Sequence, residues 1–115
     1  MSKQSILSIL NYEAENSIGD TSSAGFDERA FDRLNSLLDS DRESIVEVLK
    51  DWLEKRTHSE TMAAVVLANR LKIIELISEI SKLDEEIRAG KIFKKYYTSW
   101  TEKALAVLKA AKSGG

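Results

Sequence analysis

The absence of proline is the feature that most limits what this chain can fold into. None of its 115 residues is proline, and only five are glycine, two of them the final pair Gly114 and Gly115. β-Hairpins depend on glycine and proline at tight turns, whereas helices joined by short connections need few of either. A chain of this length is typical of one domain with its own buried core. The sequence therefore predicts a single all-α domain.

The spacing of apolar residues predicts five to six helices. Residues 3–14 hold one short apolar edge, and residues 15–25 (ENSIGDTSSAG) have no periodicity, which indicates a short helix followed by a flexible loop. The other helices are expected near 27–39, 41–56, 59–69, 71–89 and 94–112. The resulting division is 1–25 for the N-terminal helix and loop, 26–112 for the helical domain and 113–115 for a disordered tail.

Local signals mark several helix boundaries. Residues 39–41 (DSD) are expected to end one helix and cap the next, and Thr57 with Glu60 forms a capping box at the start of another. Residues 69–70 are the expected interruption before the following helix, because asparagine tolerates a left-handed conformation. Gly90 lies where a glycine just beyond a helix would end it.

The predicted helix over 71–89 is the most strongly amphipathic. Its apolar residues step by three and four along one face: Ile73, Leu76, Ile80, Leu83 and Ile87. Isoleucine and leucine at this spacing also favour a two-stranded coiled coil, but the pattern lasts only about two heptads. We expect these residues to pack within the chain, with a homodimer as the alternative.

Four aromatic residues and three lysines crowd into residues 91–100 (KIFKKYYTSW). If this segment is helical, Phe93, Tyr96, Tyr97 and Trp100 point into one arc about 100° wide, with the lysines opposite. A platform for stacking nucleic-acid bases needs rings and cations on one exposed surface. We therefore expect the four rings to face the core and the lysines to face water.

A second interpretation of this segment follows from Ser99 and Glu102, which form another capping box. The helix would then restart near residue 100, and the preceding residues would be a connection. Tyr96 and Tyr97 would be exposed beside three lysines and form a contact surface, because tyrosine is enriched where proteins bind.

The segment MAAVVLANRLKIIELISEISKLDEEIRAGKIFKKYYTSWTEKALAVL resembles the helix–turn–helix units of HEAT-like repeats over about residues 59–110. In that family a helix of small residues precedes a leucine-rich helix, and the next helix opens with an aromatic-rich turn. The proline and aspartate–arginine turn typical of the family are missing. The resemblance implies helices stacked as antiparallel αα pairs and binding of other proteins. The alternative architecture is a compact helical bundle.

Most catalytic and metal chemistry lacks its residues. The chain has no cysteine and one histidine, His58, which excludes thiolate sites and zinc sites with several histidines. No glycine-rich loop matches a phosphate-binding pattern. Carboxylates one helical turn apart, such as Glu75 with Glu79 and Glu43 with Glu47, usually form a hydrated helix face. We expect no enzyme, no cofactor and no metal site, and divalent-cation chemistry is the least favoured option.

Charge is divided unevenly along the chain. Residues 1–60 carry 7 basic and 13 acidic residues, whereas residues 61–115 carry 10 basic and 6 acidic ones. Such a dipole orients charged partners. No stretch approaches the roughly 18 apolar residues of a membrane-spanning helix, and the start lacks the basic and apolar regions of a signal peptide. These features predict a cytoplasmic protein without a membrane partner.

The predicted function is a small non-enzymatic module for protein–protein interaction, such as an adaptor, an inhibitor or an immunity-type binder. The candidate partner-binding residues are Lys91, Lys94, Lys95 and Tyr96. The alternative is a nucleic-acid-associated protein that uses the basic residues near the C-terminus: Arg88, Lys91, Lys94, Lys95, Lys103, Lys109 and Lys112.

Overall fold

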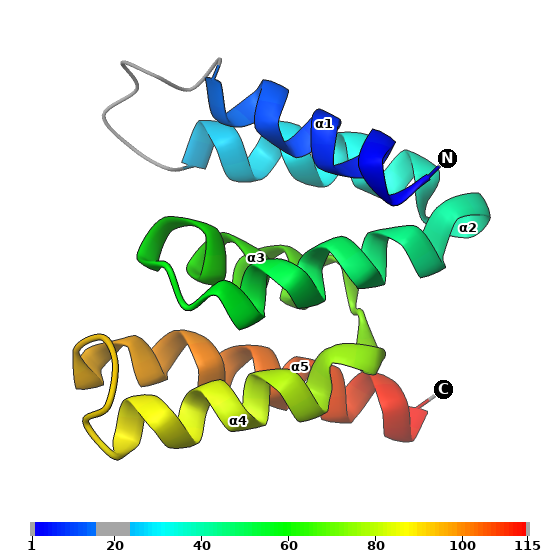
Figure 1. Ribbon diagram of the computed structural model, residues 1–115. Helices are drawn as coiled ribbons and strands as arrows, with labels where there is room; N and C mark the ends of the chain where they lie inside the picture. The colour runs from blue at the N-terminus through cyan, green and yellow to red at the C-terminus, as the bar shows by residue number, and fades with distance from the viewer. Residues whose placement is uncertain (1, 16–23, 115) are drawn as a thin grey trace. The chain divides into compact units, whose positions relative to one another are not determined.

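The computed structural model describes residues 2–15 and 24–114, and every element in them is helical (Figure 1). In chain order they are α1 (Lys3–Glu15), α2 (Ala24–Lys55), α3 (His58–Leu71), η1 (Ile74–Leu76), α4 (Ile77–Arg88), η2 (Lys95–Tyr97) and α5 (Thr98–Gly114), where η denotes a 3₁₀ helix. The all-α prediction is confirmed. Residues 16–23 of the predicted flexible loop lie outside the described residues, and the predicted division into 1–25, 26–112 and 113–115 stays a prediction.

The chain divides into two compact units, residues 1–48 and residues 49–115. In the first unit α1 lies beside the first part of α2 (Figure 1). Glu13 of α1 is only 5% exposed and pairs with two arginines of α2, Arg29 at 3.3 Å and Arg33 at 3.6 Å. The apolar residues of this unit that are buried are Ile6, Ile9, Leu10, Ala30, Leu34, Ile45 and Val48.

A kink at Asp41 interrupts α2. The Asp41 backbone leaves the helical region (φ −126°, ψ 25°), and the Ser40 hydroxyl donates to the Leu37 carbonyl oxygen at 3.3 Å. Serine hydroxyls compete in this way for helical carbonyls and bend helices. The predicted boundary at residues 39–41 is therefore confirmed: two helical segments meet at the Asp41 kink within the range Ala24–Lys55.

In the second unit, side-chain hydrogen bonds fasten the end of α2. The buried Thr61 hydroxyl of α3 donates to the Trp52 carbonyl oxygen at 2.8 Å. Arg56, in the left-handed region at φ 57°, donates to the Leu53 carbonyl oxygen and pairs with Glu86 of α4 at 2.7 Å. Thr57 is the N-cap residue of α3 as predicted, although its side chain makes no capping hydrogen bond.

The chain reverses between α3 and α4. α3 ends at Leu71 and Lys72 is left-handed (φ 56°), with the Ile73 N–H bonded to the Ala68 carbonyl oxygen at 3.0 Å. The left-handed residue and this hydrogen bond are typical of a Schellman motif, which ends a helix. The predicted helix over 71–89 therefore begins only at Ile77. Its apolar face is nevertheless buried at all five predicted positions: Ile73, Leu76, Ile80, Leu83 and Ile87.

A second Schellman motif ends α4 at the predicted glycine. Gly90 has φ +76° and its N–H bonds to the Ile87 carbonyl oxygen, while the Lys91 N–H bonds to the Glu86 carbonyl oxygen, both at 3.0 Å. The chain then returns, and α4 and α5 lie side by side (Figure 1). The predicted role of Gly90 is confirmed.

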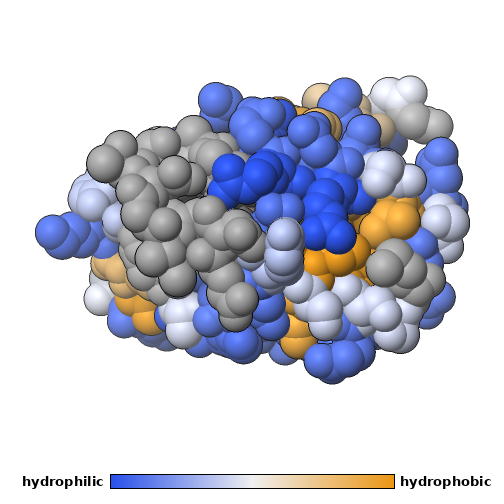
Figure 2. Space-filling view, turned by 90° about the horizontal axis from the view of Figure 1, so that it is seen from above, coloured by the Kyte–Doolittle hydropathy of each residue, from blue (hydrophilic) through white to orange (hydrophobic). Residues whose placement is uncertain are grey.

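Seen from above, hydrophilic residues cover most of the coloured surface and hydrophobic residues form smaller areas (Figure 2). Most large apolar side chains of the described residues are buried, because removing apolar surface from water stabilises the fold. Within residues 2–15 and 24–114, no helix has both the length and the apolar character to cross a bilayer.

Replacement of Gly90 by alanine tests the turn after α4. A Cβ at Gly90 would meet no atom within 4 Å, so the cost comes from the left-handed backbone alone. We expect G90A to lower the free energy of unfolding by about 1 kcal/mol in urea titrations. The control is G114A, where a Cβ also meets nothing within 4 Å and φ is not positive, and it should change stability by less than about 0.3 kcal/mol. Equal effects of the two variants would contradict the turn.

Candidate functional site

The connection between α4 and α5 does not have the helical conformation that the sequence favoured. Residues 91–94 are irregular, Phe93 is left-handed at φ 52°, and η2 leads directly into α5 at Thr98. Tyr96 is 61% exposed and Trp100 48% exposed, while Phe93 and Tyr97 are half-buried. The prediction that the four rings face the core together is therefore wrong.

The physical reason is a change of helical phase. A helical projection holds only while each residue adds about 100°, and the left-handed residues at 90 and 93 break that sum before α5 begins. In one continuous helix, Ala104, Val107 and Leu108 would share the arc of the rings. In the structure Ala104 and Leu108 are buried and Val107 is half-buried. They line the inner face of α5 without the rings.

The second interpretation is closer to the structure. α5 begins at Thr98, two residues before the expected restart, and Tyr96 lies exposed beside the lysines. The capping box itself is absent, because the Ser99 hydroxyl donates to the Tyr96 carbonyl oxygen at 2.9 Å and Glu102 pairs with Arg88. The second interpretation also places Tyr97 at the surface, but Tyr97 is half-buried.

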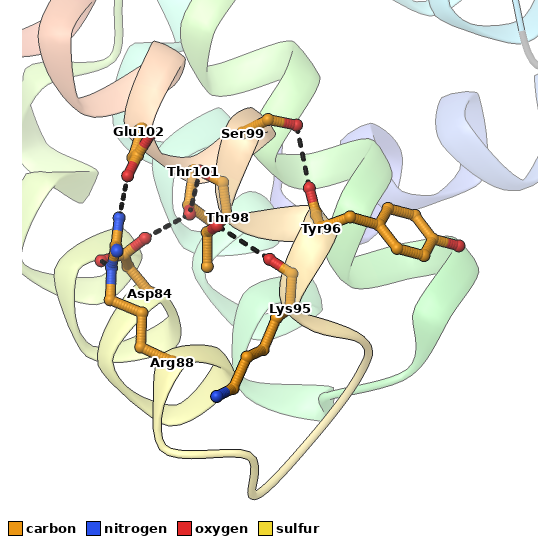
Figure 3. Close-up of polar contacts among 8 residues, drawn as sticks. All are labelled: Asp84, Arg88, Lys95, Tyr96, Thr98, Ser99, Thr101 and Glu102. Atoms are coloured by element: carbon orange, nitrogen blue, oxygen red, sulfur yellow. Dashed lines mark hydrogen bonds and ion pairs between the residues drawn. The ribbon is translucent and has the colours of Figure 1, made fainter.

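All four candidate residues, Lys91, Lys94, Lys95 and Tyr96, are exposed in this connection. Trp100, in the first turn of α5, is an exposed ring, although its helical spacing predicts a position in the core. We call these five residues the lysine–aromatic patch. The Tyr96 ring and the Lys95 side chain extend to different sides of η2, so these two patch residues do not face the same way (Figure 3).

Arg88 joins the two helices beneath the patch (Figure 3). Its guanidinium pairs with Asp84 of α4 at 2.7 Å and with Glu102 of α5. The buried Thr101 of α5 donates its hydroxyl to the other Asp84 oxygen at 2.5 Å. The end of α4 is thereby tied to the first turns of α5, and we call this cluster the Arg88 bridge.

The acids around the turn are held by arginines. Burial acts to raise the pKa of Asp84, but hydrogen bonds from Arg88 and Thr101 outweigh it and lower that pKa below its usual range. The hydrogen bond from Arg56 lowers the pKa of Glu86. Hydrogen bonds to Asp84 and Glu102 raise the pKa of Arg88, which stays cationic and engaged. Arg88 is therefore already engaged by two carboxylates, whereas the nucleic-acid alternative needs it to bind phosphate.

The patch lysines are in the opposite situation. Among the described residues, Lys91, Lys94 and Lys95 form no ion pair and no side-chain hydrogen bond. Three like charges within five residues repel each other, so the fold gains nothing from their proximity. The arginines of this unit hold the fold, whereas these lysines stay available to an anionic partner.

The Tyr96 ring of the patch is held by its neighbours. The Tyr96 and Tyr97 rings lie 4.4 Å apart with 32° between their planes, and the Tyr96 hydroxyl donates to the Tyr97 hydroxyl at 3.2 Å. This hydrogen bond raises the pKa of Tyr97. Phe93 meets Tyr97 edge to face at 6.1 Å. Tyr96 is therefore a supported ring, which costs little entropy to immobilise further on binding.

Elsewhere, a shallow depression in the first unit is lined by Ser8, Ile9, Tyr12 and Arg33. Arg33 is already engaged there, 5.7 Å over the Tyr12 ring and in an ion pair with Glu13. Within the described part of the chain, no group of three or more His, Cys, Asp or Glu side chains is arranged to hold a metal ion. The lysine–aromatic patch is thus the better candidate site.

Comparison with family models, curated proteins and solved structures gave no match to this chain. The HEAT-like resemblance stays a prediction.

Stability at low pH tests the Arg88 bridge. The folded-state pKa of Asp84 lies below its unfolded value, so its contribution is present above the unfolded pKa and is lost as pH falls through the folded pKa. We expect D84N to lower the free energy of unfolding by about 0.5–1 kcal/mol near pH 7 and to have a smaller effect near pH 3. The matched control E85Q changes an exposed neighbour and should have little effect at either pH. A D84N effect that is equal at both pH values would contradict the bridge.

Proposed function

We propose that this protein is a small non-enzymatic module for protein–protein interaction and that it binds its partner through the lysine–aromatic patch. The observation that carries the proposal is the exposure of Tyr96 and Trp100 next to three lysines without ion pairs among the described residues. Tyrosine and tryptophan are enriched at the energetic centres of interfaces. In this proposal the module is cytoplasmic, and its helices form antiparallel αα pairs similar to HEAT-like repeats.

The way the patch is built supports this proposal. The Gly90 turn and the Arg88 bridge fix the backbone on both sides of the connection, and the Tyr96 ring is supported by Tyr97. A surface that is ordered before binding loses less entropy when a partner docks. The turn presents aromatic and positively charged side chains that are exposed and do not pack in the hydrophobic core.

Single-stranded nucleic acid is the second candidate, because exposed rings and exposed cations occur together in residues 91–100, and base-stacking sites use both. The net charge of −2 speaks against it, since the field of an acidic protein disfavours approach of a polyanion. A short segment of a protein carries far fewer charges and is disfavoured less. Protein binding therefore ranks first.

Site-specific photo-crosslinking in the native cell tests the proposal. A photoreactive phenylalanine analogue at Tyr96 should capture one defined protein, whereas the same analogue at Tyr12, which is 57% exposed in the first unit, should not. Binding of that captured protein should weaken about tenfold or more in Y96A and W100A, as for interface aromatic residues, and less than about twofold in Y12A. Capture of the same protein from both positions, or equal binding by all three variants, would contradict the proposal.

A further inference from the structure

We infer that the partner presents to the lysine–aromatic patch an acidic segment in which an apolar side chain lies between carboxylates. This inference rests on the proposed function and names the chemistry of the partner. Its two parts, the negative charge and the apolar side chain, follow from different observations.

The negative charge follows from the balance of charges around the turn. After residue 88 the chain carries six lysines and one acidic residue, Glu102, and the Arg88 bridge already engages Glu102. Asp84 and Glu86 are held by Arg88 and Arg56 in the same way. The neighbouring acids are thus engaged by arginines, and no acid among the described residues forms an ion pair with Lys91, Lys94 or Lys95, although, after the hydrogen bond from Arg56, the charge of Lys91 contributes to the lowered pKa of Glu86. Carboxylates of a partner would supply the missing counter-charge.

The apolar side chain follows from the rings. Tyr96 is 61% exposed, and its hydroxyl already donates to Tyr97, so the part of Tyr96 that is left for a partner is mainly its ring. Trp100 is 48% exposed and makes no ring contact or side-chain hydrogen bond among the described residues. Aromatic surface of this kind is best covered by aliphatic or aromatic groups. A purely acidic segment would leave both rings in water.

The different directions of the patch side chains favour a limited contact. Tyr96 and Lys95 extend to different sides of η2 (Figure 3), so a segment that touches both must lie across the turn. Alternate side chains of an extended segment line the same face, which lets carboxylates and an apolar group two residues apart reach different sides of the turn. A small contact of this kind is typical of a transient interaction that depends on salt.

Titration of the isotope-labelled full chain with synthetic polymers, followed by amide NMR shifts, tests the inference. The main probe is a random copolymer rich in glutamate with a minority of tyrosine. The comparison probes are polyglutamate and single-stranded oligothymidylate. We expect the copolymer to shift amides of residues 89–103 and to bind about fivefold or more tighter than polyglutamate, because only the copolymer covers the rings. Binding should weaken as salt rises.

Two charge variants make the test specific. K94E/K95E should weaken copolymer binding about tenfold, whereas K109E/K112E, with the same charge change on exposed positions of α5, should weaken it less than about twofold. Y96A should reduce the preference for the copolymer over polyglutamate, because only the Trp100 ring is then left to be covered. Circular dichroism of each variant establishes that it is folded. Because K94E/K95E reverses the charge of the patch, this variant should gain binding to a lysine–tyrosine copolymer.

Several results would overturn the inference. They are shifts outside residues 89–103, equal binding of copolymer and polyglutamate, equal loss in both charge variants, or tighter binding of oligothymidylate, which would favour nucleic acid. A protein captured at Tyr96 whose contact segment lacks acidic residues would overturn the inference and leave the proposed function intact. Failure to capture any protein at Tyr96 overturns the proposed function, and the inference falls with it.

Discussion

The reversal of the chain between α4 and α5 is the constraint on which the candidate site depends. Gly90 ends α4 in a left-handed conformation, and the Arg88 bridge ties Asp84 to Glu102 across the two helices. If α4 ran on into a continuous helix, the rings after it would follow the helical phase and turn to the core. Because the chain turns instead, Tyr96 and Trp100 lie at the surface beside the lysines.

Arginine and lysine have separate roles around the turn between α4 and α5. Arg56 and Arg88 form hydrogen-bonded ion pairs that link helices, as the planar guanidinium allows. Lys91, Lys94 and Lys95 lie in the connection and form no such pairs among the described residues. Structural charges are thus neutralised locally, and the positive charge that remains is concentrated beside the exposed rings. This separation is the basis for proposing a binding role there.

Much of the fold could be predicted from the sequence, because its signals are local. The burial of Ile73, Leu76, Ile80, Leu83 and Ile87 follows from their spacing, and the αL turn at Gly90 follows from the conformational freedom of glycine. The left-handed turns at Lys72 and Phe93 could not be predicted, since neither residue type favours that conformation. The exposure of the lysines was expected in both interpretations of residues 91–100. The exposure of Trp100 follows from the change of helical phase at residues 90 and 93, and the turn at Phe93 is not marked by its residue type.

The two tryptophans allow the most direct test of this account, because Trp52 is 3% exposed and Trp100 is 48% exposed. Acrylamide quenching of the W52F and W100F variants measures each indole separately. The account predicts that Trp100, alone in W52F, emits at long wavelength and is quenched readily, while Trp52, alone in W100F, emits at short wavelength and resists quenching. If Trp100 proved as protected as Trp52, the rings would face the core and both the turn and the binding site proposed on it would be wrong.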